Sequence, residues 1–124
     1  MFALFSLIAC GVGDLDVTSS TEACTDHDFI NPAKSQLTTD VAGSTVLVWR
    51  TYVERDNADD VFAPEIIGEG NVLEVYEAWE AGSDGQEWCL EPRVTIRGLT
   101  GTLEVQWYTD SESVPFDTVE VEPG

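Results

Sequence analysis

Basic residues are scarce in this sequence. Five Lys and Arg stand against 24 Asp and Glu, which gives a formal net charge of -19, and Lys34 is the single lysine. Nucleic-acid binding depends on Lys and Arg contacts with phosphate, so the composition argues against nucleic acid as a partner. An anionic membrane surface would also repel the folded part, whereas cations, basic partners or simply a salty environment suit its charge. Acidic surfaces usually serve solubility and tolerance of salt, and a specific cation-binding role is the alternative.

Histidine is almost absent as well, since His27 is the only one. Catalytic Ser-His-Asp and Cys-His arrangements need a histidine beside the nucleophile, and zinc sites need more Cys and His than this chain has. Glycosidases use a pair of carboxylates, but a pair carries little information among 24 acidic residues. The sequence therefore predicts a protein without enzymatic activity and without an organic cofactor.

The apolar run at the N-terminus is too short to cross a bilayer, which takes about 20 residues. Residues 1–9 (MFALFSLIA) carry no charge and have the length of the hydrophobic region of a signal peptide. The last three residues of this run and the cysteine after it form the tetrapeptide Leu7-Ile8-Ala9-Cys10. This tetrapeptide resembles the lipobox of bacterial lipoproteins, in which the cysteine receives a diacylglycerol and the leader is removed before it. The resemblance implies lipidation of Cys10 and a membrane anchor there.

The residues around Cys10 complete this interpretation. No Lys or Arg precedes it, and the simplest explanation is a true start upstream of Met1. The small, polar residues 11–20 are typical of a tether, so we expect a signal peptide at 1–9, a tether at 10–23 and a folded domain at 24–124. Gly11 after the cysteine resembles the pattern sent to the outer membrane in enteric bacteria. The alternative is a buried N-terminal strand with a free cysteine.

Three cysteines occur in the chain, and lipidation of Cys10 leaves Cys24 and Cys89 as a pair. An oxidising envelope allows them to form a disulfide. Such a bond would close a loop of about 65 residues and contribute about 4 kcal/mol in the chain-entropy model.

From Ser44 onward, apolar and polar residues alternate, which is typical of half-buried antiparallel strands. The Gly98–Gly101 stretch between two alternating segments predicts a tight hairpin. We expect an all-β fold, a single antiparallel β-sandwich. The alternating segments are 46–53, 71–80, 93–98, 101–109 and 118–122.

The spacing of Cys24 and Cys89, with Trp49 between them, is similar to that of immunoglobulin-like domains, in which a disulfide links the two sheets. Trp49 lies too far from Cys24 for the usual core tryptophan. Glu87 stands where that family has its corner tyrosine. The resemblance therefore implies an immunoglobulin-like architecture and no more.

One polar loop concentrates oxygen ligands. Asp56, Asn57, Asp59 and Asp60 lie together, and hard cations such as calcium bind carboxylate and carbonyl oxygens. This loop is the candidate calcium site, although it does not match the EF-hand spacing. A solvated acidic loop is the alternative.

Aromatic residues offer a second candidate site. Trp79 and Trp107 fall at inward positions of their strands and are expected in the core. Tyr76, Trp88 and Tyr108 are expected to be exposed and could form a binding face for a glycan or a protein.

Arg93 and Arg97 share one face of their strand. We expect them to form ion pairs with Glu104 across the predicted hairpin.

Together these features predict a lipid-anchored cell-envelope protein of structural or protein-interaction type, in the outer membrane. Its partners would be the membrane, through the lipid, and an envelope protein or glycan. The alternative is a calcium- or carbohydrate-binding surface module on the same anchor.

Overall fold

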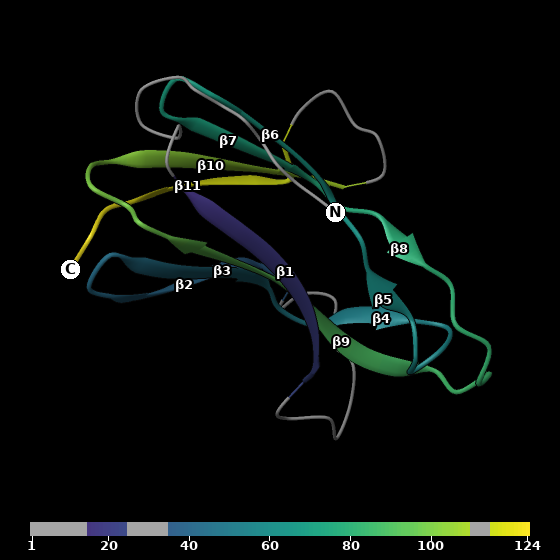
Figure 1. Ribbon diagram of the computed structural model, residues 1–124. Helices are drawn as coiled ribbons and strands as arrows, with labels where there is room; N and C mark the ends of the chain where they lie inside the picture. Colours follow the sequence, from purple (N-terminus) through teal and green to yellow (C-terminus); the bar gives the residue numbers. More distant parts are fainter. Residues whose placement is uncertain (1–14, 25–34, 110–114) are drawn as a thin grey trace.

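The computed structural model describes residues 15–24, 35–109 and 115–124, and every regular element in these ranges is a β-strand (Figure 1). A five-stranded sheet has the order β1-β9-β3-β2, with β4 also paired to β9, and a four-stranded sheet has the order β11-β10-β7-β6. β5 and β8 form a separate two-stranded sheet. The strands are β1 (Asp16–Ala23), β2 (Leu37–Ala42), β3 (Thr45–Arg50), β4 (Val53–Arg55), β5 (Val61–Phe62), β6 (Glu65–Glu69), β7 (Val72–Tyr76), β8 (Trp79–Glu80), β9 (Trp88–Arg97), β10 (Leu103–Tyr108) and β11 (Asp117–Val121).

The two larger sheets form the two layers of a sandwich (Figure 1). Each contributes the apolar side of its alternating strands to a common core. Trp107 is the largest fully buried side chain, and Phe62 stacks on it with ring centroids 5.7 Å apart. The other core residues are Leu37, Val46, Val48, Leu73, Val75, Val94, Ile96, Leu99, Leu103, Val105 and Val121.

The predicted all-β sandwich is confirmed, and one of its pairings is parallel. β7 and β10 run parallel, while all other pairs among the described strands are antiparallel. Between β7 and β10 the chain passes through β8 and then through β9 of the other sheet, so β10 returns in the direction of β7. Alternating hydrophobicity reports only that one face of a strand is buried, so it did not reveal this pairing.

Asp16–Ala23, which was predicted to belong to the tether at residues 10–23, forms β1. β1 pairs with β9 over its whole length, from Asp16 opposite Arg97 to Ala23 opposite Leu90. It is an edge strand rich in Ser and Thr, and most of its residues are exposed. Such a strand is held mainly by its backbone and shows little hydrophobic alternation, which explains why its sequence resembles a tether.

The hairpin predicted at Gly98–Gly101 is wrong, because this segment connects β9 of one sheet to β10 of the other. Leu99 is the reason. Its side chain is buried in the core, and its backbone N–H donates to the Ser44 carbonyl at 3.0 Å. The segment therefore turns inward across the end of the sandwich.

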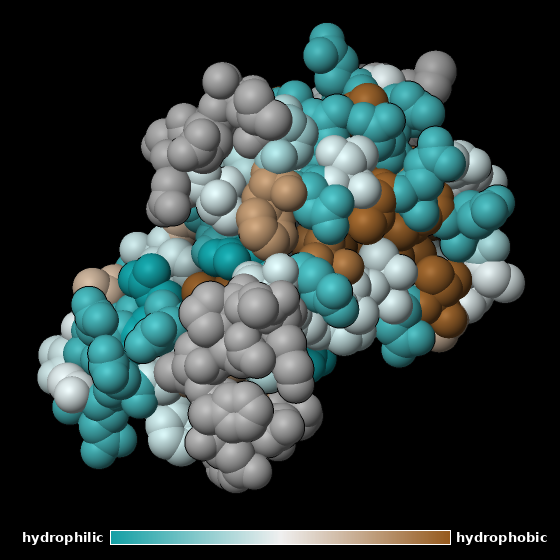
Figure 2. All heavy atoms as spheres, turned by 180° about the vertical axis from the view of Figure 1, so that it is seen from behind, coloured by the Kyte–Doolittle hydropathy of each residue, from teal (hydrophilic) through white to brown (hydrophobic). Residues whose placement is uncertain are grey.

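The surface seen from behind is largely hydrophilic, with hydrophobic residues gathered in one part of it (Figure 2). In the described ranges, no helix offers the length and apolar character needed to cross a bilayer. Among the residues that the structure describes, the exposed large hydrophobic side chains are Val41, Val61, Ile67 and Phe116.

Candidate functional site

Cys10, the predicted lipidation site, lies outside the described residues. The predicted disulfide between Cys24 and Cys89 is present, with the two Cα atoms 5.5 Å apart. It differs from an immunoglobulin disulfide, because it joins neighbouring strands of one sheet rather than two sheets. Cys24 directly follows β1, whose register with β9 ends at Ala23 opposite Leu90, and the Cys24 N–H donates to the Cys89 carbonyl at 3.1 Å.

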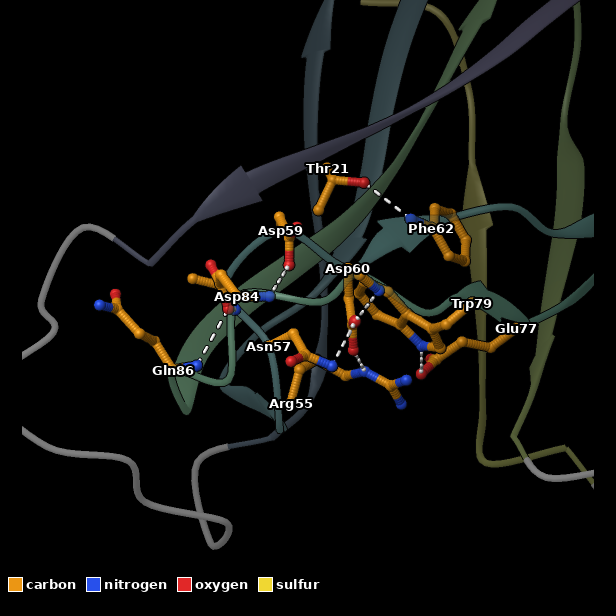
Figure 3. Close-up of polar contacts among 12 residues, drawn as sticks. Thr21, Arg55, Asn57, Asp59, Asp60, Phe62, Glu77, Trp79, Asp84 and Gln86 are labelled. Carbon is orange, nitrogen blue, oxygen red and sulfur yellow. Dashed lines mark hydrogen bonds and ion pairs between the residues drawn. The ribbon is translucent and has the colours of Figure 1, made fainter.

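The polar loop that was predicted to bind calcium is bonded to a second loop (Figure 3). The Asp59 carboxylate accepts the backbone N–H groups of Ser83 and Asp84 at 3.0 and 3.2 Å. In the opposite direction, the Asp84 carboxylate accepts the backbone N–H of Ala58 at 3.0 Å. We call this set of bonds between residues 57–60 and 82–85 the loop clamp. It holds the segment between β4 and β5 against the segment between β8 and β9.

Asn57 and Asp60 are the other members of the loop clamp. The Asn57 side-chain oxygen accepts the Gly85 N–H at 2.8 Å. Asp60 is buried, and its carboxylate accepts the Gly82 N–H at 2.6 Å and the Arg55 Nε–H at 2.8 Å. The Arg55 guanidinium lies 4.6 Å from the Trp79 ring centre, so the clamp also contacts the aromatic residues of the domain.

Hydrogen bonds set the charge state of the loop clamp. The Ser83 and Asp84 N–H groups lower the pKa of Asp59. The Gly82 N–H lowers the pKa of Asp60, assisted by Arg55 and Asn57 against the opposing effect of desolvation. Both carboxylates are therefore held in the ionised form by donors of the chain itself.

These bonds give the predicted calcium ligands a structural role. Three of them, Asn57, Asp59 and Asp60, have oxygens that accept N–H groups, and Asp56 lies exposed at the start of the loop. Among the described residues, no group of three or more His, Cys, Asp or Glu could hold a metal ion.

Glu77 forms a buried polar centre that the sequence analysis missed. Its Oε1 accepts Arg50 Nε–H at 2.7 Å and Trp107 Nε1–H at 2.8 Å. Its Oε2 accepts Arg50 Nη2–H at 2.8 Å and Trp79 Nε1–H at 3.0 Å, the latter shown in Figure 3. Two donors thus reach each oxygen, which is the full capacity of a carboxylate.

The position of Glu77 explains its role. Arg50 ends β3 in the five-stranded sheet, whereas the Glu77 N–H donates to the Tyr108 carbonyl in the four-stranded sheet at 2.9 Å. The ion pair therefore joins the two layers. Burial opposes ionisation of Glu77, but the Arg50 hydrogen bonds and charge, together with the two indole donors, lower its pKa. The alternation of the strands places Glu77 and Arg50 each on an inward position, but it does not identify them as partners.

The three residues of the predicted aromatic face do not meet. Tyr76 and Tyr108 lie opposite each other on β7 and β10 and stack with ring centroids 4.6 Å apart. The Tyr76 hydroxyl donates to Glu74 at 2.9 Å, and this bond raises the pKa of the tyrosine. Trp88 lies on β9, in the other sheet. Both tyrosines were expected to be exposed. Tyr108 is buried, and Tyr76 is half-exposed.

The expected ion pairs of Arg93 and Arg97 with Glu104 are wrong, because β9 and β10 belong to different sheets. Arg93 instead pairs with Glu91 two residues away at 2.8 Å. Its guanidinium also lies 5.2 Å from the Trp49 ring centre.

No protein-family model, curated protein or solved structure matches this chain. Inference about its function therefore starts from its residues and their arrangement.

Proposed function

We propose that the protein is a non-catalytic lipoprotein of the cell envelope, anchored through Cys10, whose domain acts by contact with another envelope protein. The observation that carries the proposal is the Leu7-Ile8-Ala9-Cys10 motif directly after an uncharged apolar run. The disulfide supports it, because disulfides persist in oxidising compartments such as the bacterial envelope.

The fold adds a geometric consequence to this anchor. Five residues, 11–15, separate Cys10 from the start of β1 at Asp16. Fully extended, these residues and the bonds to Cys10 and Asp16 span about 20 Å. The domain would therefore be held close to the lipid headgroups by the Asp16 end of the five-stranded sheet. The loop clamp, at the far end of β9, would point away from the membrane.

Outer-membrane placement follows from Gly11 after the lipidated cysteine. The calcium- or carbohydrate-binding alternative has less support. The oxygens of Asp59 and Asp60 already accept hydrogen bonds, and Trp88 lies in a different sheet from Tyr76 and Tyr108.

Incorporation of radiolabelled palmitate into the full chain in a bacterial host tests the anchor. We expect label in the parent protein and membrane fractionation, both lost in Cys10→Ala. Cys24→Ser is the matched control, because it also removes one thiol but leaves the lipobox intact. The parent and both variants are expressed with a basic n-region placed before Met1, because the sequence has no Lys or Arg before Cys10. An unlabelled parent protein under these conditions, or equal labelling of Cys10→Ala, would refute the proposal.

A further inference from the structure

The four-stranded sheet has a regular outer face, opposite the core. Residues that lie opposite each other on paired strands point to the same side of a sheet, so the register defines this face. We call it the outer face. Its three rows are Glu65, Tyr76 and Tyr108; then Ile67, Glu74, Gln106 and Thr118; then Glu69, Val72, Glu104 and Glu120.

The outer face carries five glutamates and no basic residue. The four arginines of the chain all lie elsewhere. Arg50 and Arg55 form ion pairs with Glu77 and Asp60, and the other two lie on β9 of the opposite sheet. Among the described residues, this face therefore has no positive charge of its own.

One pair on the outer face breaks a rule of sheet stability. Glu104 lies directly opposite Glu120, and like charges in this position destabilise a sheet. Glu22 and Glu91 are also opposite each other in the five-stranded sheet, but there Arg93 donates to Glu91 at 2.8 Å. Glu104 accepts only a neutral donor in this sheet, the Gln106 side-chain amide, whose Nε2 lies 2.5 Å from Glu104 Oε2. Among the described residues, a cation therefore accompanies the Glu22–Glu91 pair and none accompanies the Glu104–Glu120 pair.

Next to the carboxylates lies an apolar and aromatic area. Tyr76 and Tyr108 stack face to face, and their hydroxyls donate to Glu74 and Gln106 on the same face. Ile67 is 43% exposed in the neighbouring row. The hydrogen bonds hold the half-exposed Tyr76 ring in place, so its apolar surface is fixed before any partner arrives.

We propose that the outer face is a docking surface for a cationic segment of an envelope protein, with Arg or Lys side chains reaching Glu104 and Glu120. An arginine suits both parts of this surface, because guanidinium pairs with carboxylates through two hydrogen bonds and stacks on aromatic rings. Charge complementarity selects this partner over an acidic protein or nucleic acid. The proposal deepens the proposed function, since it names the chemistry of the protein partner.

Binding of a fluorescein-labelled ten-residue peptide of alternating Arg and Gly to the purified full chain tests the inference, by fluorescence anisotropy at low salt. We expect Glu104→Gln/Glu120→Gln to weaken binding about tenfold, because two ion pairs are lost. Asp40→Asn/Glu54→Gln is the matched control. It removes the same charge from exposed positions of the five-stranded sheet, and we expect less than about a threefold loss there.

Stability provides a second readout. Because repulsion between Glu104 and Glu120 is relieved, the same double variant is expected to unfold at a higher urea concentration than the parent while binding the peptide more weakly. Equal weakening in both double variants would mean attraction by net charge alone and would overturn the inference. No binding by the parent would also overturn it.

Sedimentation equilibrium tests whether a second copy of the chain binds the outer face. A dimer that Glu104→Gln/Glu120→Gln dissociates would assign the outer face to a second copy of the chain and overturn the cationic partner. These measurements use purified protein and do not depend on Cys10. A negative result here, with palmitate labelling intact, would therefore remove the docking surface and leave the lipid anchor standing.

Discussion

Arg50 and Glu77 form a two-pronged ion pair between the two sheets, with nitrogen–oxygen distances of 2.7 and 2.8 Å. The Glu77 side chain is 6% exposed and that of Arg50 15%. A buried pair of this kind is costly to break, because the remaining partner stays buried and uncompensated.

Replacing Glu77 with Gln should therefore lower the free energy of unfolding by about 3 to 5 kcal/mol. The amide keeps the shape of the side chain but leaves the Arg50 charge unpaired. Urea denaturation followed by tryptophan fluorescence measures the effect. Glu80→Gln, at an exposed position of β8, is the control and should change stability by less than about 0.5 kcal/mol. Similar small effects for both variants would contradict the role of the pair.

The lowered pKa of Glu77 makes part of the stability depend on pH. Since its pKa is lower in the folded than in the unfolded chain, the stabilisation is present above the ordinary value of 4.5 and is lost as the pH falls through the folded value. Asp59 and Asp60, also with lowered pKa values, act in the same direction below 3.8. Urea titrations from pH 7 to pH 3 should show the parent approaching Glu77→Gln in stability at acid pH. Taking the difference between the two proteins cancels the titration of the shared carboxylates. A constant difference would refute the assignment.

Gly82 leaves room for the loop clamp, because a Cβ atom there would collide with the Asp59 carboxylate and backbone. Gly82→Ala should therefore destabilise the protein by about 2 kcal/mol, the usual effect of overpacking. Gly101→Ala meets no atom within 4 Å and serves as the matched control, with little expected change. Thermal unfolding followed by circular dichroism distinguishes them. Equal melting temperatures for Gly82→Ala and Gly101→Ala would contradict the close contact between Gly82 and Asp59.

The disulfide joins residues 65 positions apart. Removing it with Cys24→Ser/Cys89→Ser should lower the free energy of unfolding by about 4 kcal/mol, since the unfolded chain regains the entropy of an open loop. Urea denaturation of this variant beside the oxidised parent checks the value. Reducing agent should destabilise the parent and leave the variant unchanged. A parent insensitive to reduction would contradict the stabilising role of this bond.

The sequence predicted the inward positions of the core well. Trp107 was expected in the core and is fully buried, and so are Leu73, Val75 and Val105 of the alternating segments. Trp79, also expected there, is partly buried against the core. Alternation identifies these positions because it shows which face of a strand contacts the core.

Pairing between strands was harder to predict. The Gly98–Gly101 segment has the composition of a turn, but burial of Leu99 carries it from one sheet to the other. β1 was missed because an edge strand needs few apolar residues.

The polar centre was missed for a different reason. Glu77 and Arg50 each follow the inward parity of their strands, but a charge at such a position is informative only once its partner is known. The sequence places them 27 residues apart, and only the packing of the two sheets brings them together.

The intact mass of the protein extracted from native membranes, before and after reduction and alkylation, tests the lipid anchor at Cys10 and the disulfide together. We expect a species that begins at Cys10, is heavier by its acyl chains and gains two alkylated thiols only after reduction. An unacylated chain that retains residues 1–9 and has three free thiols would contradict both the anchor and the envelope location.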